Sequence, residues 1–195
     1  MRRLTYFVGA SVDGFIADTD GSLDAFFPLP DGLVEHVVAH YPQTLPTHLH
    51  EQLGVSDPQG PFDTVVMGRG TYEPGLKEGV ASPYSHLRQY VFSTGMTSPD
   101  PAVTVVSTDP AEAVRELKRE PGEGIWLAGG GGLAAALAPE IDELIVKFYP
   151  FVLGAGIGIF NGPIAPLHLT LTGTEVLAGG AVVHTYTRNS ARRPA

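Results

Sequence analysis

Residues 65–71 read Val-Val-Met-Gly-Arg-Gly-Thr, and residues 125–132 read Ile-Trp-Leu-Ala-Gly-Gly-Gly-Gly. Each stretch has the pattern of a buried strand that runs into a glycine turn at the start of a helix. Such a turn presents backbone N–H groups at the positive end of a helix dipole, where a phosphate binds favourably. Two of these turns in one short chain suggest that it binds a dinucleotide.

The segments around these turns predict alternating strands and helices. Strand-like runs occupy residues 4–10, 64–67, 90–93, 103–106 and 124–128, and helical patterns occupy residues 31–40 and 133–137. A further helix begins at Pro110, because Asp109 can cap it and Glu112 stands where a capping box requires an acid. Strands that alternate with helices favour parallel pairing.

The C-terminal part has a different pattern. Residues 141–149, 167–172 and 181–187 are strand-like, with no helical pattern between them. We therefore expect antiparallel strands there, with a hairpin at Gly179-Gly180. The expected fold class is α/β, with a central mixed, mostly parallel sheet that is flanked by helices and an antiparallel C-terminal hairpin.

The length of 195 residues fits a single domain, which we place at residues 1–187. The section at residues 41–61 is polar and interrupted by prolines. We interpret it as a surface insertion with one short helix at residues 47–53. Residues 188–195 are expected to form a flexible tail.

The composition excludes several classes of function. The chain has no cysteine, which excludes thiolate zinc sites, iron–sulfur clusters and cysteine nucleophiles. Its formal net charge of −9 provides no general attraction to nucleic acid or anionic lipid. Neither a signal-peptide pattern nor an apolar run of membrane-spanning length is recognisable. We expect a cytoplasmic protein with neither a nucleic-acid nor a membrane partner.

The first glycine turn also carries side chains suited to a phosphate. Arg69 offers a planar set of donors, and Thr71 offers a hydroxyl at the start of a helix. Ser93 and Thr94 follow the next strand and would lie beside Arg69 if the two strands are neighbours, which would form a pocket for a ribose phosphate. The alternatives are a solvated arginine, plain turn residues and, for the glycine run, close packing of a helix against the sheet.

The glycine run matches a Rossmann fingerprint only in part. Gly129, Gly131 and Ala134 satisfy a relaxed G-x-G-x-x-A pattern. That fingerprint requires an acidic residue about twenty positions later. This chain reads Phe148-Tyr149-Pro150-Phe151 there, so we disfavour a Rossmann fold.

Two pairs among the seven histidines have metal-ligand spacing, His36 with His40 and His48 with His50. No glutamate follows His36, so the H-E-x-x-H signature is absent. We interpret these histidines as polar residues on exposed surface and expect no metal site.

Several aromatic residues could face a flat heterocycle, and core packing is the alternative for at least half of them. They are Phe26, Phe27, Tyr72, Tyr149 and Phe151.

Four motifs, taken in order, give the chain a family resemblance. They are Ser11-x-Asp13-Gly14-Phe15-Ile16-Ala17, Met67-Gly68-Arg69-Gly70-Thr71-Tyr72-Glu73, Phe92-Ser93-Thr94, and Trp126-Leu127-Ala128 followed by four glycines. With these motifs in this order and antiparallel strands expected at its C-terminal end, the chain resembles the dihydrofolate reductase-like superfamily. It most resembles the C-terminal reductase domain of the bacterial bifunctional riboflavin deaminase-reductase, over about residues 4–186.

The resemblance implies a reductase that binds NADPH across the carboxyl-terminal edge of the sheet. The implied cofactor-binding residues are Ala10, Ile16, Ala17, Gly68, Arg69, Gly70, Thr71, Ser93, Thr94, Gly129, Gly130, Gly131 and Gly132. Of these, Ala10, Ile16 and Ala17 would line the nicotinamide side. Residues 129–132 would meet the pyrophosphate. The resemblance also implies a homodimer.

Hydride transfer also needs a proton source for many substrates. In the related dihydrofolate reductases a carboxylate follows the first loop, and the catalytic candidates here are Asp24 and Glu35, together with Asp13 inside that loop. As alternatives, Asp24 and Glu35 are solvated and Asp13 caps the turn that it forms with Gly14.

Two positions depart from the riboflavin-pathway enzyme. That family tends to place a lysine before the first loop and an acidic residue before the glycine run, where this chain has Phe7 and Ala128. A phosphorylated ribose would lose partners there. We expect a small-molecule substrate that is a pterin- or pyrimidine-like heterocycle, in a reaction related to that of 5-amino-6-(5-phosphoribosylamino)uracil reductase of riboflavin biosynthesis. The alternative is a non-catalytic NADP(H)-binding or assembly module on the same fold.

Overall fold

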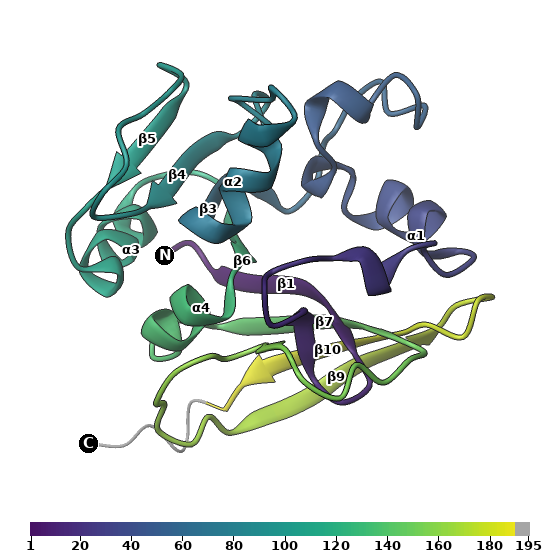
Figure 1. Ribbon diagram of the computed structural model, residues 1–195. Coiled ribbons are helices and arrows are strands. Elements are labelled where there is room, and N and C mark those ends of the chain that lie inside the picture. Colours follow the sequence, from purple (N-terminus) through teal and green to yellow (C-terminus); the bar gives the residue numbers. More distant parts are fainter. Residues whose placement is uncertain (190–195) are drawn as a thin grey trace.

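The computed structural model describes residues 1–189, which form a mixed sheet with helices on both faces (Figure 1). The strands are β1 (Leu4–Ser11), β2 (Phe15–Ala17), β3 (Phe62–Gly68), β4 (Arg88–Phe92), β5 (Val103–Val106), β6 (Gly124–Gly129), β7 (Glu143–Tyr149), β8 (Ile157–Gly158), β9 (Leu169–Val176) and β10 (Val182–Arg188). The helices are α1 (Leu33–His40), α2 (Arg69–Lys77), α3 (Pro110–Arg119) and α4 (Gly131–Leu137), with 3-10 turns η1 (Asp24–Phe26), η2 (Pro42–Thr44) and η3 (Thr47–Leu49).

The main sheet has eight strands in the order β5-β4-β3-β6-β1-β7-β10-β9, and β2 pairs separately with β8. Strands β1, β3, β4, β5, β6 and β7 are parallel to their neighbours in that group. β10 is antiparallel to both β7 and β9. This is the mixed, mostly parallel α/β sheet that the alternation of strands and helices predicts.

In the C-terminal part, β10 is antiparallel to both of its neighbours, and β7 forms the boundary with the parallel strands. The hairpin of β9 and β10 turns at Gly179-Gly180, as predicted, and the N–H of Leu177 donates to the carbonyl oxygen of Ala181 at 2.8 Å. The prediction of an antiparallel strand at residues 141–149 is confirmed on one side only, because β7 is antiparallel to β10 but pairs with β1 in parallel, with Thr5 opposite Glu143. α4 carries the chain from β6 past β1 to β7, and such helical crossovers connect parallel strands.

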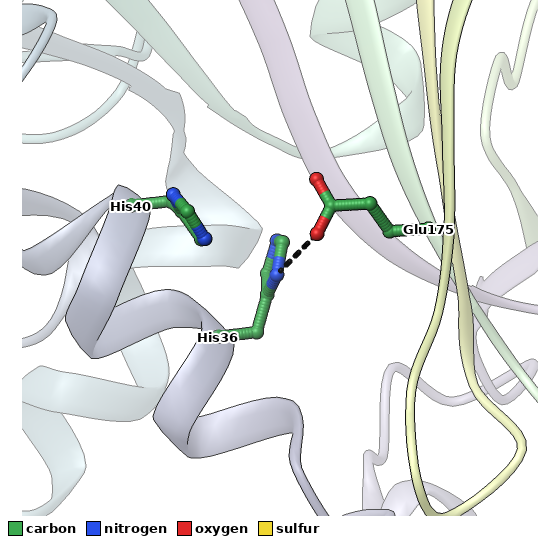
Figure 2. Close-up of side chains that lie close together, drawn as sticks. All are labelled: His36, His40 and Glu175. Atoms are coloured by element: carbon green, nitrogen blue, oxygen red, sulfur yellow. Dashed lines mark ion pairs between the residues drawn. The ribbon is translucent and has the colours of Figure 1, made fainter.

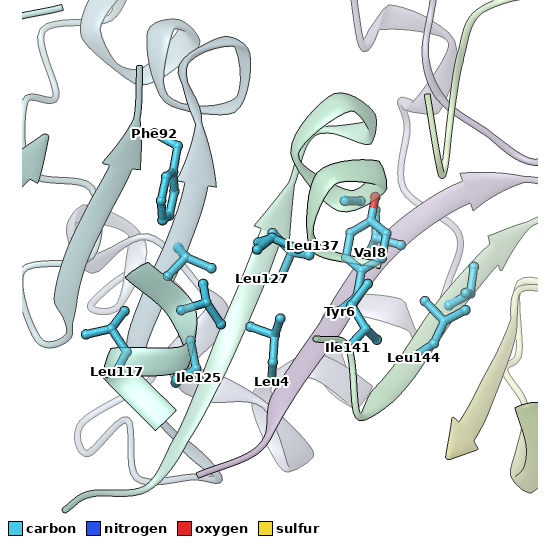
Figure 3. Packing of buried hydrophobic residues seen from close by; sticks show 14 of the residues in the cluster. Leu4, Tyr6, Val8, Phe92, Leu117, Ile125, Leu127, Leu137, Ile141 and Leu144 are labelled. Carbon is cyan, nitrogen blue, oxygen red and sulfur yellow. The ribbon is translucent and has the colours of Figure 1, made fainter. Parts of the chain in front are cut away.

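The central strands are apolar because both faces of the sheet are covered. On one face, Leu4 and Tyr6 of β1 belong to the core that also contains Leu137 of α4 (Figure 3). On the other face, Phe7 belongs to a second core with Val37 of α1. Adjacent residues of β1 thus point into opposite cores, which explains a continuous apolar run rather than an alternating one.

The helix starts follow local sequence signals. α3 begins at Pro110, and the Asp109 carboxylate accepts a hydrogen bond from the backbone N–H of Glu112 at 2.8 Å, as the capping pattern predicts. Within residues 1–189, no helix has the length and apolarity that crossing a membrane requires.

The section at residues 41–61 is buried near its start and mostly exposed from residue 51 onward. Its turn η2 buries Gln43 and Thr44, and the imidazole of His86 contacts the carbonyl oxygen of Gln43 at 2.8 Å. The short helix expected at residues 47–53 is reduced to the single 3-10 turn η3. Of the predicted tail, Arg188 is still part of β10, and residues 190–195 lie outside the described residues.

Candidate functional site

A cleft of about 1120 Å³ opens where the parallel strands of the main sheet end. Its lining includes the last residues of β3, β4, β5 and β6, which are Gly68, Phe92, Val106 and Gly129. Ligands of α/β proteins bind at this edge, because the loops and helix starts that follow the strands meet there. The cleft is therefore the candidate binding site.

The two glycine turns lie next to each other in this cleft. β3 pairs with β6, and Met67 lies opposite Gly129. A Cβ added at Gly68 would lie 3.6 Å from the backbone nitrogen of Gly130. A Cβ added at Gly129 would lie 3.2 Å from the hydroxyl oxygen of Thr71. The two predicted phosphate-binding segments thus form one continuous surface.

The glycines of this surface serve different purposes. An added Cβ at Gly70 meets no other atom within 4 Å, so this backbone is open to a ligand. A Cβ at Gly131 would overlap the carbonyl oxygen of Gly158 and lie 2.9 Å from the Cβ of Asn161. Gly131 therefore allows α4 to pack against the segment at residues 158–161.

Arg69 is the first residue of α2 and lines the cleft. Its Nε donates to Oε1 of Glu73 at 2.6 Å, and its side chain is 55% exposed. The two terminal guanidinium nitrogens make no hydrogen bond or ion pair within residues 1–189. The pairing with Glu73 thus fixes the guanidinium and leaves its outer donors for an anionic ligand.

The predicted neighbourhood of Arg69 with the next strand is confirmed. β3 pairs with β4, and Gly68 lies opposite Phe92. Ser93 and Thr94, which follow β4, line the same cleft as Arg69. Among the described residues, the Ser93 hydroxyl makes a single hydrogen bond, a long one of 3.4 Å that it accepts from the backbone N–H of Gly95. A ligand can therefore compete for it.

Two of the three residues expected on the nicotinamide side line the cleft, and the third does not. Ile16 and Ala17 of β2 line the cleft. Ala10 is fully buried in the core and does not line it.

Asp13 has a structural role in the first loop. Its carboxylate accepts hydrogen bonds from the Ser11 hydroxyl (2.6 Å) and from the backbone N–H groups of Leu153 (3.0 Å) and Gly154 (2.7 Å). These bonds, that of Ser11 above all, lower the pKa of Asp13 to about 2. An ionised carboxylate tied to residues 153–154 is unsuited to donate a proton at neutral pH.

The other two catalytic candidates are also away from the cleft. Asp24 of η1 and Glu35 of α1 are both exposed, and neither lines it. The carboxylates that do line it are Asp20 and Glu73, which sequence reasoning did not select. Asp20 accepts a hydrogen bond from the backbone N–H of Ser22 at 2.8 Å.

Tyr149 is the most distinctive aromatic residue of the cleft. Of the five aromatic candidates, Phe26, Phe27 and Tyr149 line it, whereas Tyr72 and Phe151 do not. The Tyr149 ring packs edge-on against Phe26, with centroids 5.4 Å apart. An added Cβ at Gly9 would lie 3.1 Å from its hydroxyl oxygen, so Gly9 leaves the room for this ring.

The Tyr149 hydroxyl makes no hydrogen bond within the described part of the chain, although the residue is only 8% exposed. Burial raises the pKa of Tyr149 to about 12, so the hydroxyl stays protonated at neutral pH. It is available to donate a hydrogen bond to a ligand in the cleft. Sequence reasoning recognised its aromatic ring but not this role.

A family model described as the RibD C-terminal domain matches residues 2–183. The chain belongs to the RibD C-terminal domain family. The chain is also similar to the uncharacterized protein YwjB of Bacillus subtilis (strain 168), with 31% identity over 186 residues that cover 94% of this chain and 97% of YwjB.

Solved structures share the fold. A putative riboflavin biosynthesis protein from Shewanella sp. PV-4 is 27% identical, with a TM-score of 0.71 over 97% of this chain and 99% of the other. A diaminohydroxyphosphoribosylaminopyrimidine deaminase/5-amino-6-(5-phosphoribosylamino)uracil reductase from Thermotoga maritima is 16% identical, with a TM-score of 0.65 over 96% of this chain and 57% of the other. Dihydrofolate reductase from Enterococcus faecalis, complexed with NADP(H) and RAB-propyl, is 17% identical, with a TM-score of 0.62 over 96% of this chain and 97% of the other.

The family and the structures confirm the resemblance that the four motifs indicate. This RibD C-terminal domain has the dihydrofolate reductase-like fold.

Proposed function

We propose that the protein is an NADPH-dependent reductase of a pterin- or pyrimidine-like heterocycle, related to 5-amino-6-(5-phosphoribosylamino)uracil reductase. One observation carries this proposal. Two glycine turns meet in a single cleft at the carboxyl-terminal edge of the sheet with Arg69, whose terminal guanidinium nitrogens have no partner within residues 1–189.

The phosphate-rich half of the cofactor fits the part of the cleft around α2. Arg69 would hold the 2′-phosphate together with the hydroxyls of Ser93 and Thr94. A protein with a net charge of −9 needs such a local cation to bind a polyanion. The Thr71 hydroxyl and the backbone at residues 129–132 would contact the remaining phosphates.

The opposite part of the cleft suits a flat heterocycle. Phe26 and Phe27 present aromatic surface there, and Ile16 and Ala17 add apolar surface that excludes water. Tyr149 can donate a hydrogen bond to a carbonyl oxygen or ring nitrogen of the substrate and so orient it. The bound cofactor would supply a hydride to the substrate.

Two residues argue against a phosphorylated ribose on the substrate. Ala128 lines the cleft and provides no charge. Phe7 is buried on the other face of the sheet, in the core that contains Val37. The relation to the riboflavin-pathway reductase therefore concerns the cofactor and the reaction type more than the exact substrate.

A second candidate is a module that binds NADP(H), or assembles with a partner or a second copy, without catalysis. It is favoured by the placement of Asp13, Asp24 and Glu35, none of which lines the cleft. We do not assign the proton transfer to any of these three carboxylates.

Turnover distinguishes the two candidates. The purified protein is incubated with NADPH and a panel of oxidised and dihydro pterins and pyrimidines, with and without a phosphoribosyl group, and NADPH oxidation is followed by absorbance. Saturable oxidation with at least one heterocycle supports the reductase. NADPH binding without oxidation across the panel would favour the non-catalytic module.

A further inference from the structure

Outside the cleft, three side chains of the kinds that coordinate metal ions lie close together. This cluster consists of His36 and His40 on α1 and Glu175 on β9 (Figure 2). One candidate ligand atom from each residue lies within 4.8 Å of the other two. None of the three residues lines the cleft.

The fold brings these residues together from distant parts of the sequence. His36 and His40 are four residues apart and lie on one face of the helix, with ring centroids 4.8 Å apart. The hairpin of β9 and β10 holds the start of this helix, because the N–H of Gly179 donates to the carbonyl oxygen of Asp31 at 2.8 Å. Glu175, near the end of β9, thus faces the two histidines, as Figure 2 shows.

His36 is buried and incompletely satisfied. Its side chain is 5% exposed, and Nδ1 lies 3.3 Å from Oε2 of Glu175. Its Nε2 is buried without a hydrogen-bond partner within residues 1–189. The interpretation of His36 as an exposed polar residue is therefore wrong. Within residues 1–189, the only polar contact of this buried imidazole is the Glu175 carboxylate, so Nδ1 is the nitrogen that can share a ligand with that carboxylate.

The separation of ligand atoms agrees with tetrahedral coordination. Two ligands about 2.1 Å from one ion at a tetrahedral angle lie about 3.4 Å apart. The distance of 3.3 Å between His36 and Glu175 meets this requirement. His40 is exposed, so a change of its side-chain rotamer can close the remaining distance.

One cation approaches the cluster from a nearby strand. Lys147 of β7 lies opposite Val183 of β10, which in turn lies opposite Glu175 of β9. The Nζ of Lys147 lies 3.4 Å from the centroid of the Phe7 ring, so an aromatic face holds this cation.

We propose that His36, His40 and Glu175 bind a divalent transition-metal ion of the zinc type. Two imidazoles and one carboxylate form a donor set that is common for zinc, and water would complete the coordination. The ion would connect α1 to the edge strand β9. It would also fix the loop before α1, whose Phe26 and Phe27 line the cleft. The proposal replaces the expectation of no metal site and does not depend on the proposed reductase activity.

The test is a titration of untagged, chelator-treated full-length protein with Co²⁺, followed by its visible d–d absorption, and then competition with Zn²⁺. We expect one ion per chain, with displacement by Zn²⁺ but not by Mg²⁺. The variants His40→Ala and Glu175→Gln remove exposed ligands and should each weaken binding at least about tenfold.

Matched controls remove the same residue types elsewhere. His48→Ala and Glu116→Gln change exposed side chains and should bind the ion as the parent protein does. Circular dichroism checks that every variant is folded. The proposal is overturned if the parent binds no Co²⁺, if both ligand variants retain parental affinity, or if His48→Ala loses binding as well.

Discussion

Arg69→Ala tests whether the cleft recognises the 2′-phosphate of NADPH. The variant removes a guanidinium group that lines the cleft and whose outer donors have no partner within residues 1–189. A charged hydrogen bond contributes about 1.5–3 kcal/mol. Its loss should weaken NADPH binding by about 10- to 150-fold. NADH has no 2′-phosphate, so its affinity should stay within about threefold of the parent value, a change of less than about 0.7 kcal/mol.

The substitution should leave the fold intact. The ion pair of Arg69 with Glu73 joins residues four apart on a helix and is 55% and 36% exposed at its two ends. Such pairs contribute only about 0.3–0.5 kcal/mol to stability. Arg115→Ala is the matched control, because Arg115 is 50% exposed, its Nε donates to a carboxylate of Glu140 at 2.8 Å, and it lies outside the cleft.

The assay is isothermal titration of each protein with NADPH and NADH at fixed ionic strength. Arg115→Ala removes the same charge and should retain the parental preference for NADPH. Equal weakening of NADPH and NADH by Arg69→Ala would refute the assignment to the 2′-phosphate. If both variants weakened NADPH binding equally, the loss would be explained by the change in net charge alone.

Three further perturbations test the site and the fold around it. Tyr149→Phe should lower kcat/KM by up to about tenfold, because one neutral hydrogen bond to the substrate is lost. The assay is steady-state kinetics with the heterocycle found by screening, and unchanged kinetics would show that Tyr149 does not contact the substrate. In α4, Gly131→Ala should lower the free energy of unfolding in urea by about 1–3 kcal/mol, because the new Cβ would overlap the carbonyl oxygen of Gly158. Gly132→Ala should not destabilise the protein, because its Cβ would lie 3.9 Å from the carbonyl oxygen of Asn161, an ordinary contact. Equal effects of the two substitutions would contradict the packing argument. Because the pKa of Asp13 is lowered to about 2, its carboxylate stabilises the fold above the unfolded-state pKa near 3.8 and loses this effect as the pH falls towards 2. The stability difference between the parent and Asp13→Asn, measured by thermal unfolding from pH 6 to pH 2, should therefore become smaller at acidic pH. A difference that does not change with pH would contradict the ionised role.

The sequence identified the features that depend on local physics. The glycine turns, the cap at Asp109 and the hairpin at Gly179-Gly180 each involve residues close together in the chain, so their patterns are readable without the fold. The position of Ser93 beside Arg69 required only that successive strands be neighbours, which is the common arrangement.

The features that were missed depend on distant contacts. The parallel pairing of β7 follows from the path of α4 past β1, which the strand pattern of residues 141–149 does not encode. Glu175 reaches His36 only because the C-terminal hairpin folds back on α1. The free hydroxyl of Tyr149 depends on the absence of a side chain at Gly9 on a neighbouring strand.

The central claim, that the cleft is an NADP(H) site, is tested most directly by thermal unfolding with NADPH, NADP⁺, NADH or no ligand. A ligand that binds only the folded state raises the unfolding midpoint. We predict that NADPH and NADP⁺ raise it more than NADH does at equal concentration. An unchanged midpoint with all three nucleotides, in a protein that unfolds cooperatively, would contradict the claim and leave both glycine turns with a purely structural role.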